Sequence, residues 1–242
     1  MKIIGIGGAH SGIGKTTLAS KLINHIVNEK AEKIFGVKWG AIKYSRTDFY
    51  SSLTNDESIL STKDKDTARL LSSGAKEVYW IQSPPEELNE TIPIALEKLS
   101  YLDGIVVEGN SAIDFIKPNI IVFLHSNKEI PLKKTASSLI NKSDLVIHFT
   151  NYNRENICSD NHFDIITYDI NSLDFSEFFS IISNKLIDKE LKRLLIENNN
   201  ENKITCSKAN EIAKLLSIPH KRVGDMINSM KIKITKCELG CF

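Results

Sequence analysis

The sequence predicts an α/β protein in which helices cover both faces of a mostly parallel sheet, joined to a small helical module at residues 203–242. Three observations support this fold class. Short strands that are apolar throughout alternate with amphipathic helical stretches over residues 1–197, a pattern typical of a parallel sheet buried on both faces. A glycine-rich loop separates the first strand from the first helix. An Asn/Glu-rich stretch, ENNNENK, has the composition of a linker in front of a basic segment.

The predicted elements follow one another in a regular order. Strands are expected at 2–7, 34–44, 77–83, 104–109, 119–124, 144–149 and 163–169. Helices are expected at 16–30, 66–76, 91–102 and about 175–196, where apolar residues recur at helical spacing. Asp66 is expected to cap the second helix and Gly74 to end it, and the polar residues 45–65 are expected to form a loop.

The composition limits the classes of protein to which the chain can belong. The chain has 242 residues, of which 41% are hydrophobic and 25% charged, and its net charge is +1. These values suit one α/β domain with an appendage, and they exclude nucleic-acid binding through the net charge of the whole molecule. No run of about 18 apolar residues or signal peptide is apparent, and four cysteines are too few for a disulfide scaffold. We therefore expect a cytoplasmic protein that does not enter a membrane.

The loop GGAHSGIGKTT at residues 7–17 predicts a phosphate-binding site, or P-loop (Walker A motif). It follows a strand and precedes a helix, so glycine backbone N–H groups and the helix N-terminus can surround phosphate oxygens. Lys15 is expected to reach the β- and γ-phosphates, Thr16 to bind Mg²⁺, and Thr17 to lie near the α-phosphate. Ala9 takes the first motif position, where Gly and Ala both occur. The nucleotide-binding residues predicted here are Gly8, His10, Ser11, Gly12, Ile13, Gly14, Lys15, Thr16 and Thr17.

A carboxylate is expected beside this loop. The stretch LDGIVVEGN ends a buried strand with Glu108, and ligands of open α/β sheets bind at the carboxyl ends of strands. Glu108 is therefore a candidate for holding Mg²⁺ together with Thr16 or for orienting water, and Lys15 and Glu108 are the candidate catalytic residues. The alternative is a carboxylate at a strand end that only faces water.

Two segments are candidates for reading the base. Residues 141–144, NKSD, fit the N-K-x-D pattern that reads guanine, but they precede a strand where that motif should follow one. We interpret this match as accidental. Asn151 follows the same strand and is the better candidate.

Four stretches in order, GGAHSGIGKTT, WGAIKYSRTDF, KDKDTARLLSSGAKEV and VVEGN, resemble the molybdopterin-guanine dinucleotide biosynthesis protein B (MobB) family. The resemblance covers about residues 1–125. It implies that Lys43 matches the family lysine after the second strand, that Asp66, Thr67 and Arg69 match an Asp-Ser…Arg element, and that Glu108 matches the Val-Glu-Gly acid.

The resemblance also implies a function. It implies binding of GTP, with ATP left open, and slow Mg²⁺-dependent hydrolysis. The nucleotide would serve molybdenum cofactor biosynthesis, with molybdopterin or a MobA-like transferase as partner, and we expect a homodimer.

The chain departs from the family pattern at several positions. Tyr44 stands where His is usual, Asp64 stands where Gly is usual, and Asn110 and Ser111 follow the Glu-Gly. His10 stands where ATPases of similar topology carry an additional lysine. Because a neutral imidazole lacks a fixed charge, we expect slow hydrolysis unless a partner or a dimer supplies a cation.

The segment 203–242 is basic, with eight Lys/Arg against three Asp/Glu. Helices are expected at 207–216 and 220–230 around a short turn, followed by a strand at 231–236, an arrangement that resembles a helix-turn-helix with a wing. Lys221 and Arg222 are candidates for touching DNA phosphates. The alternative is a module for protein interaction or dimerisation.

The cysteines of this segment are candidates for a metal site. Cys206, Cys237 and Cys241 could bind zinc or an iron–sulfur cluster, with His220 or Cys158 as a fourth ligand. A redox pair or plain buried thiols are the alternatives. The remaining histidines near strands, His125, His148 and His162, are expected to be core or loop residues.

Two other functions remain open from the residues alone. One is a P-loop kinase of a small metabolite, although only Arg46, Arg69 and Arg154 fall within the first 160 residues, too few for an arginine-rich lid. The other is a nucleotide-controlled DNA-binding regulator that uses the basic segment.

Overall fold

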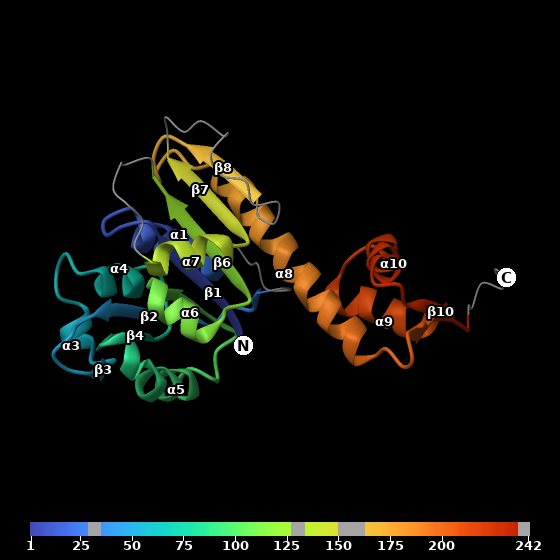
Figure 1. Cartoon of the computed structure of the whole chain (residues 1–242), viewed down its shortest axis with the longest axis horizontal. Coiled ribbons are helices and arrows are strands. Elements are labelled where there is room, and N and C mark those ends of the chain that lie inside the picture. The colour runs from blue at the N-terminus through green and yellow to red at the C-terminus, as the bar shows by residue number, and fades with distance from the viewer. Residues whose placement is uncertain (29–34, 127–133, 150–162, 237–242) are drawn as a thin grey trace. The chain divides into compact units, whose positions relative to one another are not determined.

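A computed structural model describes residues 1–28, 35–126, 134–149 and 163–236 (Figure 1). The chain forms two compact units, Met1–Phe179 and Ser180–Phe242, and each is described by itself. The sequence predicts domains at 1–197 and 203–242, whereas the division between the compact units falls inside the long helix α8 (Phe175–Glu197). Within the described ranges, none of the helices combines the length and apolar character needed to cross a membrane.

The described residues of the first unit form a sheet of eight strands in the order β3-β4-β2-β5-β1-β6-β7-β8. Every pairing is parallel except that of β3 with β4. The strands are β1 (Lys2–Gly8), β2 (Trp39–Arg46), β3 (Ser52–Thr54), β4 (Val78–Ser83), β5 (Gly104–Glu108), β6 (Ile120–His125), β7 (Leu145–Phe149) and β8 (Phe163–Thr167). The mostly parallel sheet predicted from the apolar runs is confirmed.

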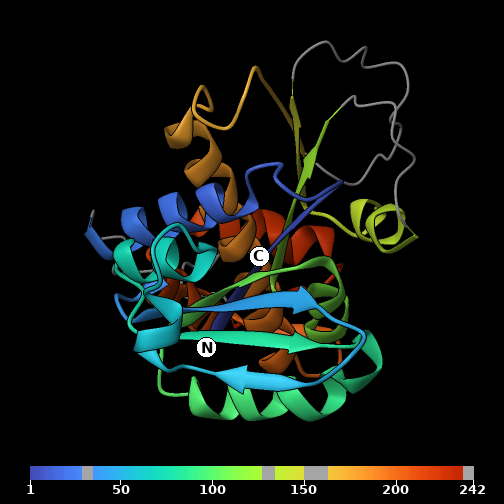
Figure 2. The ribbon, with the colours of Figure 1, turned by 90° about the vertical axis from the view of Figure 1, so that its left-hand side faces the viewer.

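Helices cover both faces of this sheet. Figure 2 shows α1 and α4 above the sheet and α5 below it. The helices of this unit are α1 (Lys15–Asn28), α3 (Glu57–Leu60), α4 (Asp66–Ser72), α5 (Leu88–Lys98), α6 (Asn110–Ile116) and α7 (Lys134–Asn141). Helix α1 buries Leu18, Leu22 and Ile26 at helical spacing, which places its apolar face on the sheet. All five residues of β5 are buried because helices pack on both of its sides.

Several predicted boundaries are wrong. The strand expected at 34–44 begins only at Trp39, and the loop expected at 45–65 contains β3 and α3. Helix α4 ends at Ser72, and its N-cap residue is Lys65, without a side-chain cap, so Asp66 begins the helix instead of capping it. These elements are short, and their sequences lack the long periodic pattern on which prediction depends.

Polar side chains at the amino ends of the strands accept hydrogen bonds from the backbone at neighbouring strands. Asn119 Oδ1 accepts a hydrogen bond of 2.7 Å from Ile3 N at the start of β1. Asp103 Oδ2 accepts bonds of 2.9 Å from the N–H groups of residues 37 and 38, just before β2. Asp144 Oδ2 accepts from Ile121 N in β6 at 2.9 Å. Asp144 is the last residue of NKSD, so this segment lies at the opposite edge of the parallel sheet from the glycine-rich loop.

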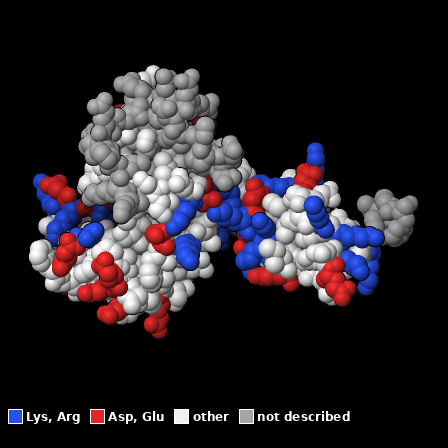
Figure 3. All heavy atoms as spheres, viewed as in Figure 1, with Lys and Arg blue, Asp and Glu red and all other residues white. Residues whose placement is uncertain are grey.

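The second unit contains α9 (Cys206–Leu216), α10 (His220–Ser229) and two strands, β9 (Lys203–Thr205) and β10 (Lys233–Thr235). The two strands pair in parallel. The predicted helices and the strand at its C-terminal end are present, but β9 was not predicted, and the β9–β10 pair is not the antiparallel hairpin of a wing. In Figure 3, Lys and Arg side chains cover part of the visible face of this unit.

Candidate functional site

The glycine-rich loop joins β1 to α1 at the carboxyl edge of the sheet. Gly12 and Gly14 have φ of +75° and +102°, a region that favours glycine. Ile13 between them is 7% exposed and anchors the loop. Leu18 N donates to Gly14 O at 3.0 Å, so the helix hydrogen-bonding pattern begins at the loop. The backbone N–H groups of this turn and of the first helical residues are therefore available to an anion.

Asn110 holds the start of the loop. Its Oδ1 accepts from Gly8 N and its Nδ2 donates to Gly8 O, both at 3.0 Å. A Cβ on Gly8 would lie 2.7 Å from the side chain of Ile13, so this position requires glycine. Asn110 was noted only as a departure from the family pattern, and its place directly after Glu-Gly is the signal that could have identified it.

Lys15 folds back over the loop. Its Nζ donates to His10 O at 2.8 Å. Burial lowers the pKa of Lys15, and the charge of Lys43 lowers it further, while Glu108 opposes this shift. The ammonium is therefore held in a partly desolvated place where a phosphate could replace the carbonyl as its partner.

His10 is occupied within the chain. Its Nε2 lies 2.8 Å from Ser126 Oγ, beyond the end of β6, and its Nδ1 lies 2.8 Å from Ser11 O. The ring thus fixes the tip of the loop to the neighbouring strand.

Four side chains from four elements form a connected network below the loop. Thr16 Oγ1 on α1 donates to Glu108 Oε2 at 2.9 Å, and Glu108 is only 2% exposed. Lys43 Nζ on β2 donates to Glu108 Oε1 at 2.5 Å and to Asp66 Oδ2 at 2.7 Å. Lys43 therefore joins a buried carboxylate to one at the start of α4.

Asp66 and Arg69 extend this network toward α1. Arg69 Nη2 donates to Thr17 Oγ1 at 2.6 Å. Burial acts to raise the pKa of Asp66, but the hydrogen bond and charge of Lys43, with a contribution from Thr16, hold the pKa below its ordinary value. Asp66 is therefore ionised at neutral pH and complements Lys43.

The structure explains two of the residues that depart from the family pattern, Asp64 and Tyr44. Asp64 has a φ of +66°, a conformation that Gly adopts freely and Asp tolerates. Tyr44 fills the place of the usual His, and its hydroxyl donates to Ser83 O at 2.8 Å. A Cβ on Gly109, where φ is +128°, would lie 2.9 Å from Tyr44 Cβ, so the glycine after Glu108 is required.

The residues fit Mg²⁺. Thr16 and Glu108 place a hydroxyl and a carboxylate side by side, and Mg²⁺ prefers oxygen ligands and usually takes one or two carboxylates together with substrate phosphates.

The structure brings most of the predicted site residues together, namely residues 8–17, Lys43, Asp66, Arg69 and Glu108. Asn151, Cys158, Cys237 and Cys241 lie outside the described residues. Cys206 lies in the second unit as a free thiol. In the part of the chain that the structure describes, no group of three or more His, Cys, Asp or Glu side chains could hold a metal ion, and zinc or iron–sulfur binding stays a prediction.

A parallel sheet, a phosphate loop between β1 and α1, and an acid at the end of the adjacent strand β5 define a P-loop NTPase fold. The chain belongs to the family described as Molybdopterin guanine dinucleotide synthesis protein B (MobB), whose sequence model matches residues 3–146. The family predicted from four sequence stretches is thereby confirmed.

Other comparisons add little. No curated protein matches the chain. A similar solved structure is the "apo" form of LpxK from Aquifex aeolicus in complex with ATP, at 13% identity and a TM-score of 0.41. The match covers 69% of this chain and 53% of the LpxK chain, so the chain spans about half the length of that protein.

Proposed function

We propose that this chain binds GTP, or alternatively ATP, with Mg²⁺ and assists the synthesis of molybdopterin guanine dinucleotide, hydrolysing the nucleotide slowly. The observation that carries the proposal is the convergence of Lys15, Thr16 and Glu108 on one glycine-rich loop. Membership of the MobB family supports the pathway.

The loop supplies most of the binding. Its N–H groups and the N-terminus of α1 would surround the β-phosphate, and Lys15 would exchange His10 O for oxygens of the β- and γ-phosphates. Thr16 and Glu108 would hold Mg²⁺, which neutralises charge on the phosphates during their transfer. Thr17, bonded to Arg69, would lie beside the α-phosphate.

We expect slow hydrolysis because the basic side chains near the loop already have partners within the chain. His10 is bonded to Ser126 and Ser11, and Lys43 is bonded to Glu108 and Asp66. Neither supplies an unengaged positive charge to a departing phosphate, and cations supplied by partners accelerate related reactions by about 10³- to 10⁵-fold. The second subunit of a homodimer or a MobA-like transferase would then supply the cation and control turnover in the cytoplasm.

Calorimetry with GTP and ATP, with and without Mg²⁺, tests this proposal. Wild-type protein should bind at least one nucleotide, Lys15→Ala should weaken binding at least tenfold, and Thr16→Ala should remove the gain from Mg²⁺. Lys98→Ala, an exposed lysine of α5, is the matched control and should bind like the wild type. Failure of the wild type to bind either nucleotide would end the proposal.

A further inference from the structure

A cavity of about 200 Å³ lies between the first residues of α4 and the sheet. Its lining residues are Lys43, Ser45, Lys65, Asp66, Thr67 and Trp80. Lys43 and Trp80 are partners in the pairing of β2 with β4, and Ser45 follows two residues after Lys43, so these three side chains leave the same face of the sheet. The volume is below the range of about 300–1,000 Å³ that is usual for drug-sized ligands, so the cavity suits a flat ring system and not a whole nucleotide.

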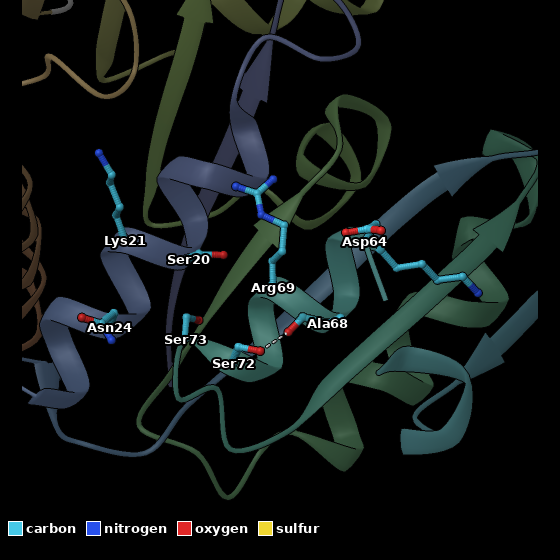
Figure 4. A pocket seen from close by; sticks show the side chains of 9 residues that line it. Ser20, Lys21, Asn24, Asp64, Ala68, Arg69, Ser72 and Ser73 are labelled. Carbon is cyan, nitrogen blue, oxygen red and sulfur yellow. Dashed lines mark hydrogen bonds between the residues drawn. The ribbon is translucent and has the colours of Figure 1, made fainter. Parts of the chain in front are cut away.

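The basic side chains of a larger cavity are directed out of it. This cavity of about 610 Å³ lies between α1 and α4. Figure 4 shows Arg69 reaching from α4 toward α1, where it donates to Thr17. Lys21 donates to a backbone carbonyl, and the ammonium of Lys65 lies over Trp80, a lining residue of the smaller cavity. Lys65 is therefore directed to the smaller cavity.

The ring of Trp80 gives the smaller cavity an aromatic wall. Its Nε1 donates to Ser45 Oγ at 3.0 Å, which sets the orientation of the indole. The indole is partly exposed, and the Lys65 ammonium lies 5.1 Å from the ring centre. This ring face is thus covered by the end of a flexible side chain. A planar ligand can stack on the indole when Lys65 moves outward.

Hydrogen-bond donors surround this wall. Lys43 has three N–H donors and gives two of them to carboxylates. Ser45 accepts from Trp80 and can still donate its own proton. Among the described residues, Lys65 forms no ion pair. Donors beside an aromatic face match a heteroaromatic ring that carries carbonyl or ring-nitrogen acceptors.

The cavity adjoins the network below the glycine-rich loop. Lys43 and Asp66 line the cavity and also belong to the network that includes Glu108 and Thr16. A ring stacked on Trp80 would therefore lie beside the residues that fit Mg²⁺ and would leave the loop free to hold phosphates.

We propose that this cavity binds the planar heteroaromatic ring of a second ligand, stacked on Trp80, while the loop holds the nucleotide. The Lys65 ammonium leaves the indole face and, together with Lys43 and Ser45, donates to acceptors on the edge of the ligand ring. The pterin ring of molybdopterin belongs to this chemical class, and in naming it the inference rests on the proposed function.

The experiment fills the loop before the ring is added. Full-length protein is saturated with Mg²⁺ and a non-hydrolysable GTP or ATP analogue. Pterin is then titrated, and its fluorescence is excited where tryptophan does not absorb. The wild type should quench this fluorescence saturably without releasing the analogue. Inorganic phosphate should not displace the pterin, and indole, a flat ring without an acceptor, should displace it only weakly.

Variants of the cavity test the contacts. Trp80→Leu should weaken pterin binding about tenfold or more, because stacking is lost. Ser45→Ala removes a donor and releases the indole, and Lys65→Glu sets a carboxylate against the ring acceptors, so each should weaken pterin binding about fivefold. Trp80→Leu and Ser45→Ala should bind the analogue like the wild type, which shows that they are folded.

Lys63→Glu is the matched control, because Lys63 is exposed, two residues from Lys65, and does not line the cavity. It should leave pterin affinity unchanged. Four results would overturn the inference: no binding of pterin to the loaded wild type, wild-type pterin affinity in Trp80→Leu, an equal loss in Lys63→Glu, or displacement by phosphate. Release of the analogue by pterin would also overturn it, since the two would then share one site. If the analogue itself does not bind, the proposed function has failed, and the same titration of the nucleotide-free protein decides this inference.

Discussion

The side-chain amide of Asn110 makes two hydrogen bonds with the backbone of Gly8, one to its N–H and one to its carbonyl. Asn110 begins α6 and Gly8 ends β1, so the entry to the phosphate loop is fixed by a residue from a distant part of the chain. The phosphate site therefore depends on the packing of α6 as well as on the loop sequence.

Replacing Asn110 should loosen the loop. Asn110→Ala leaves the buried Gly8 backbone without two partners, which should cost about 1–3 kcal/mol in the free energy of unfolding. Asn110→Asp keeps the acceptor for Gly8 N but sets a carboxylate oxygen against Gly8 O and adds a negative charge beside the phosphate loop, so it should cost more. Urea denaturation measures both variants, and nucleotide affinity should fall in the same order. Equal losses for the two variants would contradict the role of the paired bonds.

Removing Lys43 should leave Glu108 as a buried carboxylate without its cation. Glu108 is 2% exposed and Lys43 13% exposed, and breaking a buried pair from one side costs roughly 3–5 kcal/mol. Lys43→Met should therefore destabilise the protein strongly, as measured by urea denaturation. The double variant with Glu108→Gln should recover most of the loss, because the carboxylate that still lacks Lys43 is then Asp66, which is 45% exposed and not buried. A double variant no more stable than Lys43→Met would count against this pairing.

Two glycines should respond to alanine in opposite directions. Gly109 has a φ of +128° and no room beside Tyr44, so Gly109→Ala should cost about 1–3 kcal/mol. Gly224 lies within α10 with nothing within 4 Å of the Cβ position, so Gly224→Ala should stabilise the second unit by about 0.5–1 kcal/mol. Thermal unfolding followed by calorimetry measures both effects. A Gly109→Ala variant more stable than the wild type would contradict the prediction for Gly109.

The first unit should lose stability in mild acid because of His125. Burial lowers the pKa of His125 below its ordinary value of 6.5, and the neighbouring His148 lowers it further. The unfolded chain then binds the proton more readily than the folded chain, so stability falls as pH drops below about 6.5. The difference in Tm between pH 7.5 and 5.5 should shrink in His125→Phe. A difference in Tm that is the same in His125→Phe as in the wild type would contradict this assignment.

Arg222 should stabilise the second unit instead of binding DNA. Its guanidinium donates to Asp188 Oδ1 at 2.8 and 3.0 Å, and to Asn184 Oδ1 and O at 2.9 and 3.1 Å. Arg222→Lys loses this planar arrangement and should cost roughly 1–2 kcal/mol. Lys221→Ala, beside it and exposed, should leave stability unchanged.

A gel shift with double-stranded DNA completes that comparison. The prediction from sequence that both residues touch DNA phosphates would be supported if Lys221→Ala and Arg222→Lys weakened a shift equally. We expect that neither variant changes the fraction of DNA that is shifted, since the guanidinium of Arg222 is bonded to residues of α8.

The sheet and the loop could be predicted because both depend on local sequence. Strands such as β5 are apolar throughout, and the residues of a phosphate loop are adjacent in the chain. Glu108 could be placed because the carboxyl ends of parallel strands meet at one edge.

Contacts between distant residues could not be predicted in this way. The place of Asn110 after Glu-Gly marks it as a site residue but does not reveal that its partner is Gly8. Nothing local indicates that Lys43 bridges Glu108 and Asp66 or that His10 bonds to Ser126. The strand β9 has three residues and pairs with β10, which lies far from it in sequence, so its sequence alone carries no strand pattern.

The hydrogen bonds from Asn119, Asp103 and Asp144 at the amino edge of the sheet have a consequence for evolution. They maintain strand alignment at the rim opposite the loop, so substitutions around the loop need not disturb the frame. Residues at the carboxyl rim that do not support the fold, unlike Lys43, Gly109 and Asn110, can thus diverge in ligand preference, which lets one architecture serve many activities. Homologues that differ in what they bind should retain a hydrogen-bond acceptor at these three positions.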